Sequence, residues 1–140
     1  MTRWTLVAAG IVLAAGGLIA ARHDEKHDAV RTLAVRDIAE KLDGKKAKAT
    51  TVEVTLGPGE ASAPHRHPGP VFGYVLEGEY EWAIEDNPVK LLKAGDTFYE
   101  PTGCLHGISR NPSKKNKARF IAVVLHPEDA REIVIPEKKK

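Results

Sequence analysis

The chain has 140 residues, with 21 basic and 19 acidic side chains, a net charge of +2 and a single cysteine. This length accommodates one domain of ordinary size, so it excludes a multidomain enzyme. One cysteine cannot form a disulfide within the chain. The near balance of charges is not typical of nucleic-acid binding, which usually needs a concentrated basic surface, and we therefore expect no nucleic-acid partner.

Residues 4–21 form an uncharged, apolar stretch directly after Arg3. As a helix this stretch would extend roughly 27 Å, close to the hydrocarbon thickness of a bilayer. A buried core helix fits poorly, because the stretch lies at the N-terminus and has no polar face. We expect a hydrophobic helix, with residues 1–21 acting as a cleaved signal peptide or an uncleaved membrane anchor. The protein would then be exported, either periplasmic or extracytoplasmic, or anchored to the cytoplasmic membrane by residues 4–21.

The chain after residue 21 has 119 residues and a net charge of +1. That is long enough for one compact core. Residues 22–48 are predicted to be a tether and an N-terminal edge segment, residues 49–136 a barrel, and residues 137–140 a charged tail. Within the second segment two alternatives stay open, an edge strand that includes Leu33 and Val35, or a helical turn that ends at Gly44.

From Thr51 onward the hydrophobic pattern changes to period two, which is typical of half-buried strands. Gly and Pro residues separate the short runs, and helical periodicity is scarce. The continuous apolar run 120–125 indicates a strand buried on both faces. These features predict an all-β sandwich or barrel. The expected strands are 51–56, 71–76, 79–84, 89–92, 97–100, one starting near Ile108, 120–125, and a last strand or docked tail at 133–135.

Two of the six histidines, His65 and His67, are separated by one residue. On a strand, residues i and i+2 point to the same face, so the two imidazoles would converge while Arg66 points away. Paired imidazoles suit a divalent metal better than an apolar core. His23 and His27 are interpreted as solvated tether residues, and His126 as a structural residue at the end of a strand.

A wider frame of residues surrounds this pair: Gly59, His65, His67, Gly78, Gly95, Pro101, Gly103 and His106. The spacing of this frame resembles the two conserved motifs of the cupin superfamily, and eight of the ten motif positions match. Arg110 stands where the second motif has asparagine, with Asn111 one residue later. The resemblance implies a double-stranded β-helix, or jelly-roll, barrel. It also implies one divalent metal held by His65, His67 and His106, with Fe, Mn, Ni, Cu and Zn all open.

The chain departs from the cupin pattern at the glutamate of the first motif. Val71 occupies that position, and Phe72 would occupy it if the motif contained one extra residue; neither can coordinate a metal. Three alternatives stay open. Waters complete a three-histidine shell, Glu100 supplies the missing carboxylate or hydrogen-bonds to a ligating imidazole, or the site is vestigial and empty.

Several other side chains lie close to the frame in sequence. The aromatic residues Phe72, Tyr74, Phe98 and Tyr99 are expected to include pocket walls. Trp82 is interpreted as a core residue. Cys104 is expected to be a small buried filler, with a soft metal ligand as the alternative.

The resemblance implies a metal-dependent protein that acts on or binds a small molecule. The first hypothesis is a mononuclear enzyme of oxygenase or isomerase type for a small anionic or enolate-like substrate, with either Glu100 or a metal-bound hydroxide as the catalytic base. The three-histidine pattern resembles thiol and diketone oxygenases more than the glutamate-containing ones. The alternatives are a non-catalytic module that binds a metal or small ligand, and a purely structural metal. Cupins often dimerise through sheet edges, so the resemblance leaves a homodimer open, but the sequence indicates no interface.

Overall fold

The structure, a computed structural model, describes residues 30–138. The hydrophobic segment 4–21, His23 and His27 lie outside the described residues. Residues 30–138 form ten strands and no helix, so no helix among them is long and apolar enough to cross a membrane. The strands are β1 (Val30–Leu42), β2 (Lys45–Leu56), β3 (His65–Arg66), β4 (Val71–Glu77), β5 (Glu79–Ile84), β6 (Lys90–Lys93), β7 (Thr97–Glu100), β8 (His106–Arg110), β9 (Ala118–Pro127) and β10 (Ile135–Pro136).

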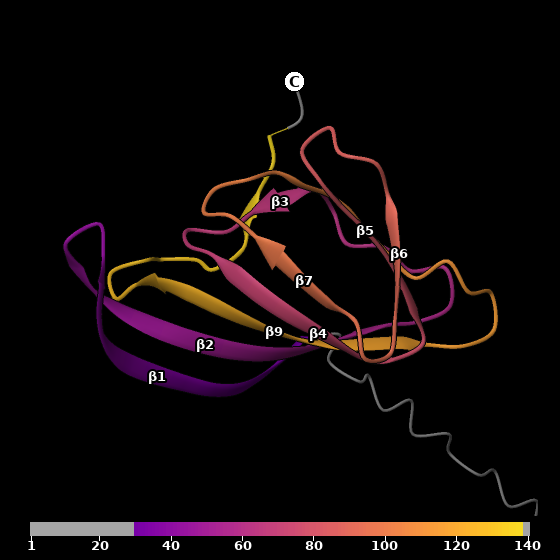
Figure 1. Cartoon of the computed structure of the whole chain (residues 1–140), viewed down its shortest axis with the longest axis horizontal. Coiled ribbons are helices and arrows are strands. Elements are labelled where there is room, and N and C mark those ends of the chain that lie inside the picture. Colours follow the sequence, from indigo (N-terminus) through magenta and orange to yellow (C-terminus); the bar gives the residue numbers. More distant parts are fainter. Residues whose placement is uncertain (1–29, 139–140) are drawn as a thin grey trace, which may run out of the picture.

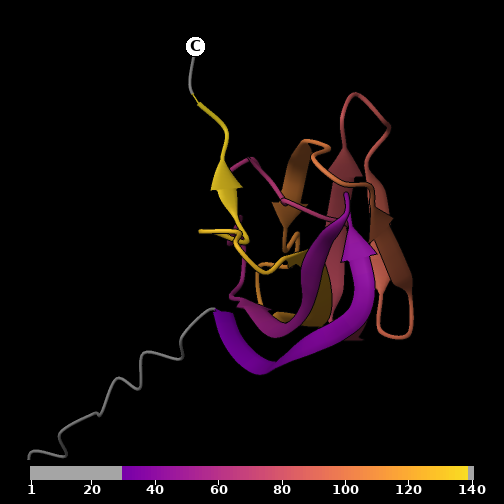
Figure 2. The ribbon, with the colours of Figure 1, turned by 90° about the vertical axis from the view of Figure 1, so that its left-hand side faces the viewer.

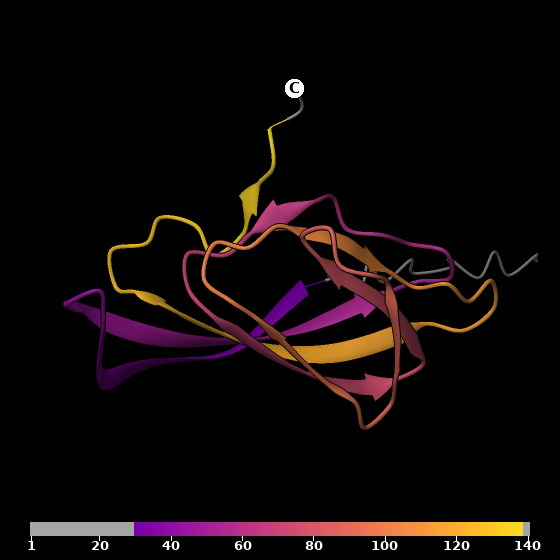
Figure 3. The same ribbon diagram turned by 45° about the horizontal axis from the view of Figure 1, so that its top comes forward.

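The strands form two antiparallel sheets that face each other (Figures 1 and 3). One sheet has the order β1-β2-β9-β4-β7, and the other has the order β10-β3-β8-β5-β6. Consecutive strands such as β4 and β5 lie in different sheets, so the chain passes repeatedly from one sheet to the other. This arrangement confirms the all-β, two-sheet architecture expected from the sequence.

The first two strands form a long hairpin at the edge of the first sheet. Its turn is Asp43-Gly44, and both residues have positive φ values, 51° and 76°. A two-residue turn of this kind matches the right-handed twist of the strands it joins, and Asp-Gly is a preferred sequence for it. The edge strand is therefore the correct alternative, and the helical turn ending at Gly44 is wrong. The second strand also begins at Lys45, earlier than the alternation from Thr51 indicates.

Strand β9 alternates strictly between buried and half-buried residues. Phe120, Ala122 and Val124 face the barrel interior, whereas Ile121 and Val123 lie on the outer face. The prediction of a strand buried on both faces is therefore wrong. In an antiparallel sheet one face can pack on the core while the other faces solvent.

The hydrophobic core lies between the two sheets. Phe98 approaches β4 so closely that a Cβ at Gly73 would lie 1.9 Å from its ring. Only glycine leaves room for this ring. Tyr80 stacks on Phe120, with ring centroids 4.4 Å apart, and so joins the second sheet to the first. The buried core residues are Val52, Leu56, Val71, Val75, Tyr80, Trp82, Phe98, Phe120, Ala122 and Val124.

The C-terminal segment returns to the second sheet and ends beside β3 (Figure 2). In β10, Ile135 pairs with Arg66 and Pro136 pairs with His65. The Glu137 amide donates to the Pro64 carbonyl over 3.0 Å. Of the two alternatives at 133–135, the last strand is the correct one, although β10 covers only Ile135–Pro136, and it pairs with the strand that carries the first histidine.

Candidate metal centre

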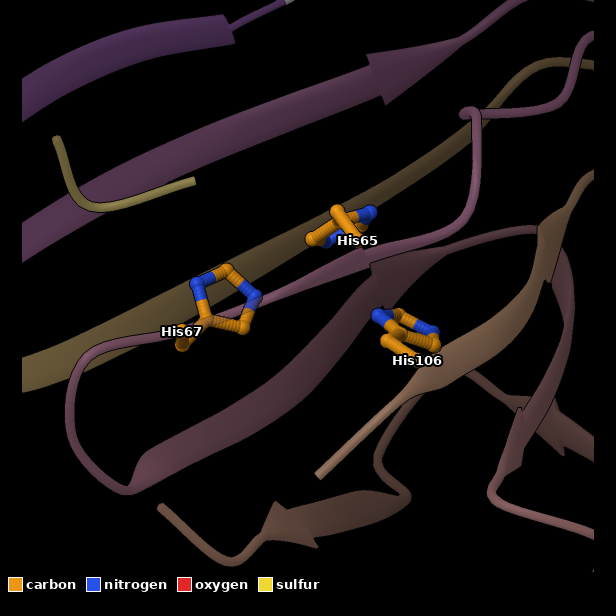
Figure 4. Close-up of side chains that lie close together, drawn as sticks. All are labelled: His65, His67 and His106. Carbon is orange, nitrogen blue, oxygen red and sulfur yellow. The ribbon is translucent and has the colours of Figure 1, made fainter. Parts of the chain in front are cut away.

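Three histidines, two in the neighbouring strands β3 and β8 and one just after β3, converge inside the barrel (Figure 4). His65 begins β3 and His67 follows its end, while His106 begins β8. His65 and His106 are direct partners across the β3–β8 pair. One nitrogen from each ring lies within 4.8 Å of the others, a separation that allows a single cation to bind all three. The group predicted from the motif spacing is thus brought together by the fold.

Backbone carbonyls fix the orientation of two of these rings. His65 Nδ1 lies 2.7 Å from the Ala63 carbonyl oxygen, and His67 Nδ1 lies 2.6 Å from the Ile133 carbonyl oxygen. A carbonyl only accepts, so each Nδ1 carries the hydrogen and donates. In both rings Nε2 then keeps its lone pair, which is the form that coordinates a metal.

The third ring, His106, contacts polar groups on both sides. Its Nδ1 lies 3.2 Å from Glu100 Oε1, and its Nε2 lies 3.3 Å from the Tyr80 hydroxyl. The Tyr80 hydroxyl is also 2.9 Å from Ser109 Oγ. Because Tyr80 and Ser109 can exchange donor and acceptor roles, the hydroxyl pair is compatible with either tautomer of His106.

Glu100 brings a carboxylate into the same group. Its side chain is buried at the end of β7, with Oε2 3.6 Å from His67 Nε2. Trp82 Nε1 donates to Oε1 over 3.1 Å. Glu100 is also the direct cross-strand partner of Val71, the residue at the motif position where cupins have glutamate. The fold therefore places a carboxylate beside the position from which the sequence lacks one.

Two buried polar atoms in this group have no hydrogen-bond partner among the described residues, Glu100 Oε2 and His106 Nδ1. Buried polar atoms are almost always satisfied, so each exception needs an explanation. Both atoms can present a lone pair, and both belong to side chains that face the histidine group. A bound cation would satisfy them, and the donor set of imidazoles with one carboxylate is suited to a divalent transition metal.

Burial favours the uncharged forms of the side chains in this group. Desolvation, reinforced by the charges of His65 and His67, lowers the pKa of His106 to about 3. Burial likewise lowers the pKa of His67. Burial raises the pKa of the Glu100 carboxyl to about 7, although the Trp82 hydrogen bond acts in the opposite direction. Neutral imidazoles are the state that metal coordination requires.

A cavity of about 230 Å³ lies beside the histidines and extends between the sheets. Its polar lining consists of the three histidines, Glu100, Ser62 and Ser109. The rest of the lining is apolar, and no lysine or arginine of residues 30–138 contributes to it. Val30 of β1 and the C-terminal residues Ile133 and Val134 also line the cavity. A small molecule could therefore lie against a metal bound at this site.

Several expected pocket residues have other positions. Phe98 lines the cavity, but Phe72, Tyr74 and Tyr99 are about half exposed, at 51%, 47% and 50%. They lie on the outer face of β4 and β7, where Phe72 packs against Tyr99. Their prediction as pocket walls is wrong, because alternation along each strand sends them outward while Val71, Phe98 and Glu100 point inward.

Other individual predictions have mixed outcomes. Cys104 is only half buried, so its interpretation as a buried filler is wrong, and it is not part of the histidine group. Arg66 points away from the histidines as expected and binds Glu137 and the Gly103 carbonyl. His126 is buried and contacts Thr50 Oγ1 at 2.9 Å, which agrees with a structural role.

Sequence reasoning did not identify Tyr80, Ser109 and Ile133 as neighbours of the site. Tyr80 carried a usable signal, because it alternates with glutamates along a strand and so faces inward with Trp82. Ile133 acts through its backbone carbonyl, for which no sequence signal exists. The assignment of Trp82 to the core is confirmed, but its indole nitrogen also donates to Glu100.

Comparison with known families agrees with the geometry. A model of the family described as "Cupin domain" matches residues 52–124, which include all three histidines, Val71 and Glu100. This chain belongs to the cupin superfamily. Among curated proteins, none is similar enough in sequence to count as a match.

Solved structures share the cupin fold at low sequence identity. An uncharacterised double-stranded β-helix protein from Klebsiella pneumoniae is 27% identical, with a TM-score of 0.52, over 64% of this chain and 76% of that chain. An RmlC-like cupin from Methanocaldococcus jannaschii is 21% identical, with a TM-score of 0.52, over 79% and 94%. An oxalate oxidase in complex with the substrate analogue glycolate is 22% identical, with a TM-score of 0.50, over 75% and 54%.

Proposed function

We propose that this cupin binds one divalent metal ion through His65, His67 and His106, with Glu100 as the carboxylate of the site. The observation that carries the proposal is the pair of unpartnered buried atoms, Glu100 Oε2 and His106 Nδ1, at a point where imidazole nitrogens converge. Leaving a buried polar atom unsatisfied costs about 1–3 kcal/mol, so a group that satisfies both atoms is strongly favoured.

The position of Glu100 supports its role beside the metal. Paired residues in antiparallel strands have Cβ atoms about 4.5–5.5 Å apart, a distance that a glutamate side chain can span. A carboxylate on β7 can therefore act where cupins have one on β4. Of the three alternatives left open by the sequence, the substitute carboxylate is the one that this register supports.

The metal centre and the adjoining cavity support an enzyme of oxygenase or isomerase type that acts on a small molecule. When bound, a divalent metal supplies Lewis-acid or redox chemistry. The chain itself holds His65 and His67 in fixed tautomers, contacts His106 through the Tyr80 hydroxyl, and surrounds the ligand with a largely apolar lining. Among the described residues that line the cavity, Glu100 is the only carboxylate and therefore the candidate base.

Metal binding is tested on the full chain by titrating Fe²⁺, Mn²⁺, Ni²⁺, Cu²⁺ and Zn²⁺ and measuring stoichiometry by calorimetry. We expect one ion per chain, and we expect His106→Gln to lower the affinity by more than tenfold. His126→Gln is the matched control, because His126 is also a buried β-strand histidine but lies outside the group. If no metal binds stoichiometrically, or both variants have the same effect, the proposal is wrong.

Enzymatic activity is tested by a turnover assay that is independent of the metal titration. The metal-loaded chain is incubated with thiols, diketones and flavonols while oxygen uptake and products are measured. Turnover that His106→Gln abolishes supports the enzyme. Ligand-dependent thermal stabilisation without any product instead supports the alternative, a non-catalytic binding module.

We also propose that residues 4–21 direct the protein out of the cytoplasm, as a cleaved signal or as an anchor. The support is the uncharged length of this segment, which matches a bilayer. Cell fractionation with N-terminal sequencing tests it. A cytoplasmic protein with an intact N-terminus contradicts the proposal.

A further inference from the structure

The cavity beside the histidines has an unusual division of chemistry. Its polar groups gather on one side, where His65 and His106 belong to the second sheet and Glu100 approaches them from β7. The opposite wall comes from β2 and β9 of the first sheet, through Val54 and Ala122, and is entirely apolar. A ligand in this cavity must therefore have a polar part that faces the histidines and Glu100, and an apolar part that faces β2 and β9.

The cationic side chains nearest to the site are not available to a ligand in the cavity. Arg66 lies between the two histidines in sequence, but its guanidinium bonds to Glu137 and to the Gly103 carbonyl. Within residues 30–138 the cavity lining contains neither lysine nor arginine. The cavity opens to solvent near Val30 and Val134, which are 56% and 46% exposed. A charged group that lies deeper in the lining and does not reach the metal would be buried without a partner, which is unfavourable.

The C-terminal segment also lines the cavity with apolar side chains. Ile133, Val134 and Pro136 line the cavity together with Val30. These residues add apolar surface and no charged group. The part of a ligand that extends away from the histidines therefore contacts apolar side chains of β1 and of the C-terminal segment.

We infer that the ligand of this site is a small molecule with a single metal-binding head and an uncharged hydrocarbon body. The inference rests on the proposed metal site and narrows its substrate class. It disfavours molecules whose second, distal charged group would stay inside the apolar part of the cavity, such as dicarboxylates of about the cavity's length. It also refines the expectation of a small anionic substrate, because any negative charge must lie on the head that contacts the metal.

The inference is tested with three hydroxamic acids, which share one chelating head and differ only in the tail. They are acetohydroxamic acid, hexanohydroxamic acid, and adipic monohydroxamic acid, which ends in a carboxylate. The full chain is loaded with Co²⁺, and binding is followed by the visible spectrum of the metal and by calorimetry. Burial of each methylene is expected to tighten binding about fourfold, so the hexanoyl compound, with four more methylenes, should bind about two-hundredfold more tightly than the acetyl compound.

The carboxylate-ended probe should lose most of this gain and bind at least tenfold more weakly than hexanohydroxamic acid.

Protein variants test whether the tail lies against the apolar wall. Ala122→Val, which adds methyl groups to this wall, should weaken binding of the hexanoyl compound about tenfold and leave binding of the acetyl compound unchanged. Val54→Leu is a second variant of the same wall if the first does not fold. Val123→Leu is the matched control, because Val123 is the next residue along β9 and points outward.

Each outcome distinguishes this inference from the proposed function. If Co²⁺ binds and acetohydroxamic acid binds, but the longer tail adds nothing or the carboxylate is tolerated equally, the inference is wrong and the metal site stands. If Ala122→Val and Val123→Leu affect the hexanoyl compound alike, the tail does not occupy the cavity and the inference is also wrong. If Co²⁺ does not bind, the proposed function fails and this inference fails with it.

Discussion

Val71 and Glu100 are direct partners in the antiparallel pair of β4 and β7, and both side chains are buried inside the barrel. The cupin motif has glutamate at the first position, whereas this chain has valine there and glutamate across the pair. A metal centre depends on where its donor atoms lie and not on which strand supplies them. The exchange therefore changes the source of the carboxylate while keeping it beside the histidines.

The first prediction concerns this exchange. Glu100→Gln should lower metal affinity by roughly 10- to 100-fold, the usual loss when a group that contacts a metal or its ligands is changed. The double variant Val71→Glu/Glu100→Val returns the carboxylate to the motif position, so it should recover most of the affinity. Calorimetric titration of the full chain measures both.

Glu100→Val alone is the control for the double variant, and it should bind metal as weakly as Glu100→Gln. Wild-type affinity in Glu100→Gln would show that Glu100 does not act on the metal. Failure of the double variant, with folding intact by circular dichroism, would show that the two positions are not interchangeable.

The histidine group could be predicted because the spacing of His65 and His67 indicates a common face on a strand, and the resemblance to the cupin motifs adds His106. The role of Glu100 could only be left open, because the register of β4 against β7 is a tertiary property that no local pattern encodes. The same reason explains the error over Tyr99. An inward Glu100 requires an outward Tyr99, but the direction of that strand was undetermined until its partner was known.

The sequence was sufficient to predict the class of the fold but not all of its long-range contacts. Short alternating runs separated by Gly and Pro were sufficient for an all-β assignment. The N-terminal hairpin is one of two alternatives in the sequence, because Gly44 fits a helix end as well as a turn, although Asp43-Gly44 is a strong hairpin signal. The contact between Ile133 and His67 could not be predicted, since it uses a backbone carbonyl brought in from a distant part of the chain.

The second prediction concerns the pH dependence of the metal-free protein. The folded pKa of Glu100 is raised to about 7 by burial from an ordinary value of 4.5, so the folded state holds one more proton than the unfolded state between these values. Its contribution to stability is present at low pH and is lost as pH rises towards 7. His106, whose folded pKa is lowered to about 3 from 6.5, contributes in the opposite direction, and stability from this group rises with pH between those values.

Glu100→Gln removes the contribution of Glu100, which decreases as pH rises, and leaves the contribution of His106. The free energy of unfolding of the wild type, minus that of Glu100→Gln, should therefore fall by about 3 kcal/mol between pH 4.5 and 7. Urea denaturation of both chelator-treated proteins at several pH values measures this difference. A difference that stays constant with pH contradicts the assignment of a raised pKa to Glu100.

The third prediction concerns the indole of Trp82. Trp82→Phe removes the donor to Glu100 Oε1, which is 3.1 Å away, while keeping an aromatic ring in the core. A hydrogen bond to an ionised acceptor is worth more than one to a neutral group, so the loss should be larger above pH 7 than at pH 5. We expect the metal-free protein to lose about 1–3 kcal/mol of unfolding free energy at pH 8.

Lys90→Ala is the control for Trp82→Phe, because the Lys90 ammonium lies 5.7 Å from the Trp82 ring centroid and acts through the ring and not the indole donor. Its effect should not depend on pH across this range. Equal losses for Trp82→Phe at pH 5 and pH 8 would mean that packing, and not the bond to Glu100, accounts for the change.

The fourth prediction concerns the C-terminal segment. His67 Nδ1 donates to the Ile133 carbonyl, and this contact holds Nε2 towards the metal position. Truncation after Glu132 removes the acceptor together with the β10 pairing to Arg66. Metal affinity should then fall about tenfold or more, as for the loss of other groups that orient metal ligands.

Truncation after Glu137 is the matched control for this shortening. It removes only the three terminal lysines and keeps the Ile133 carbonyl, β10 and the Arg66–Glu137 ion pair. Its metal affinity should equal that of the full chain in the same calorimetric titration. If truncation after Glu132 leaves the affinity unchanged while the barrel remains folded, the C-terminal segment does not orient His67, and the ring must be held by its packing inside the barrel alone.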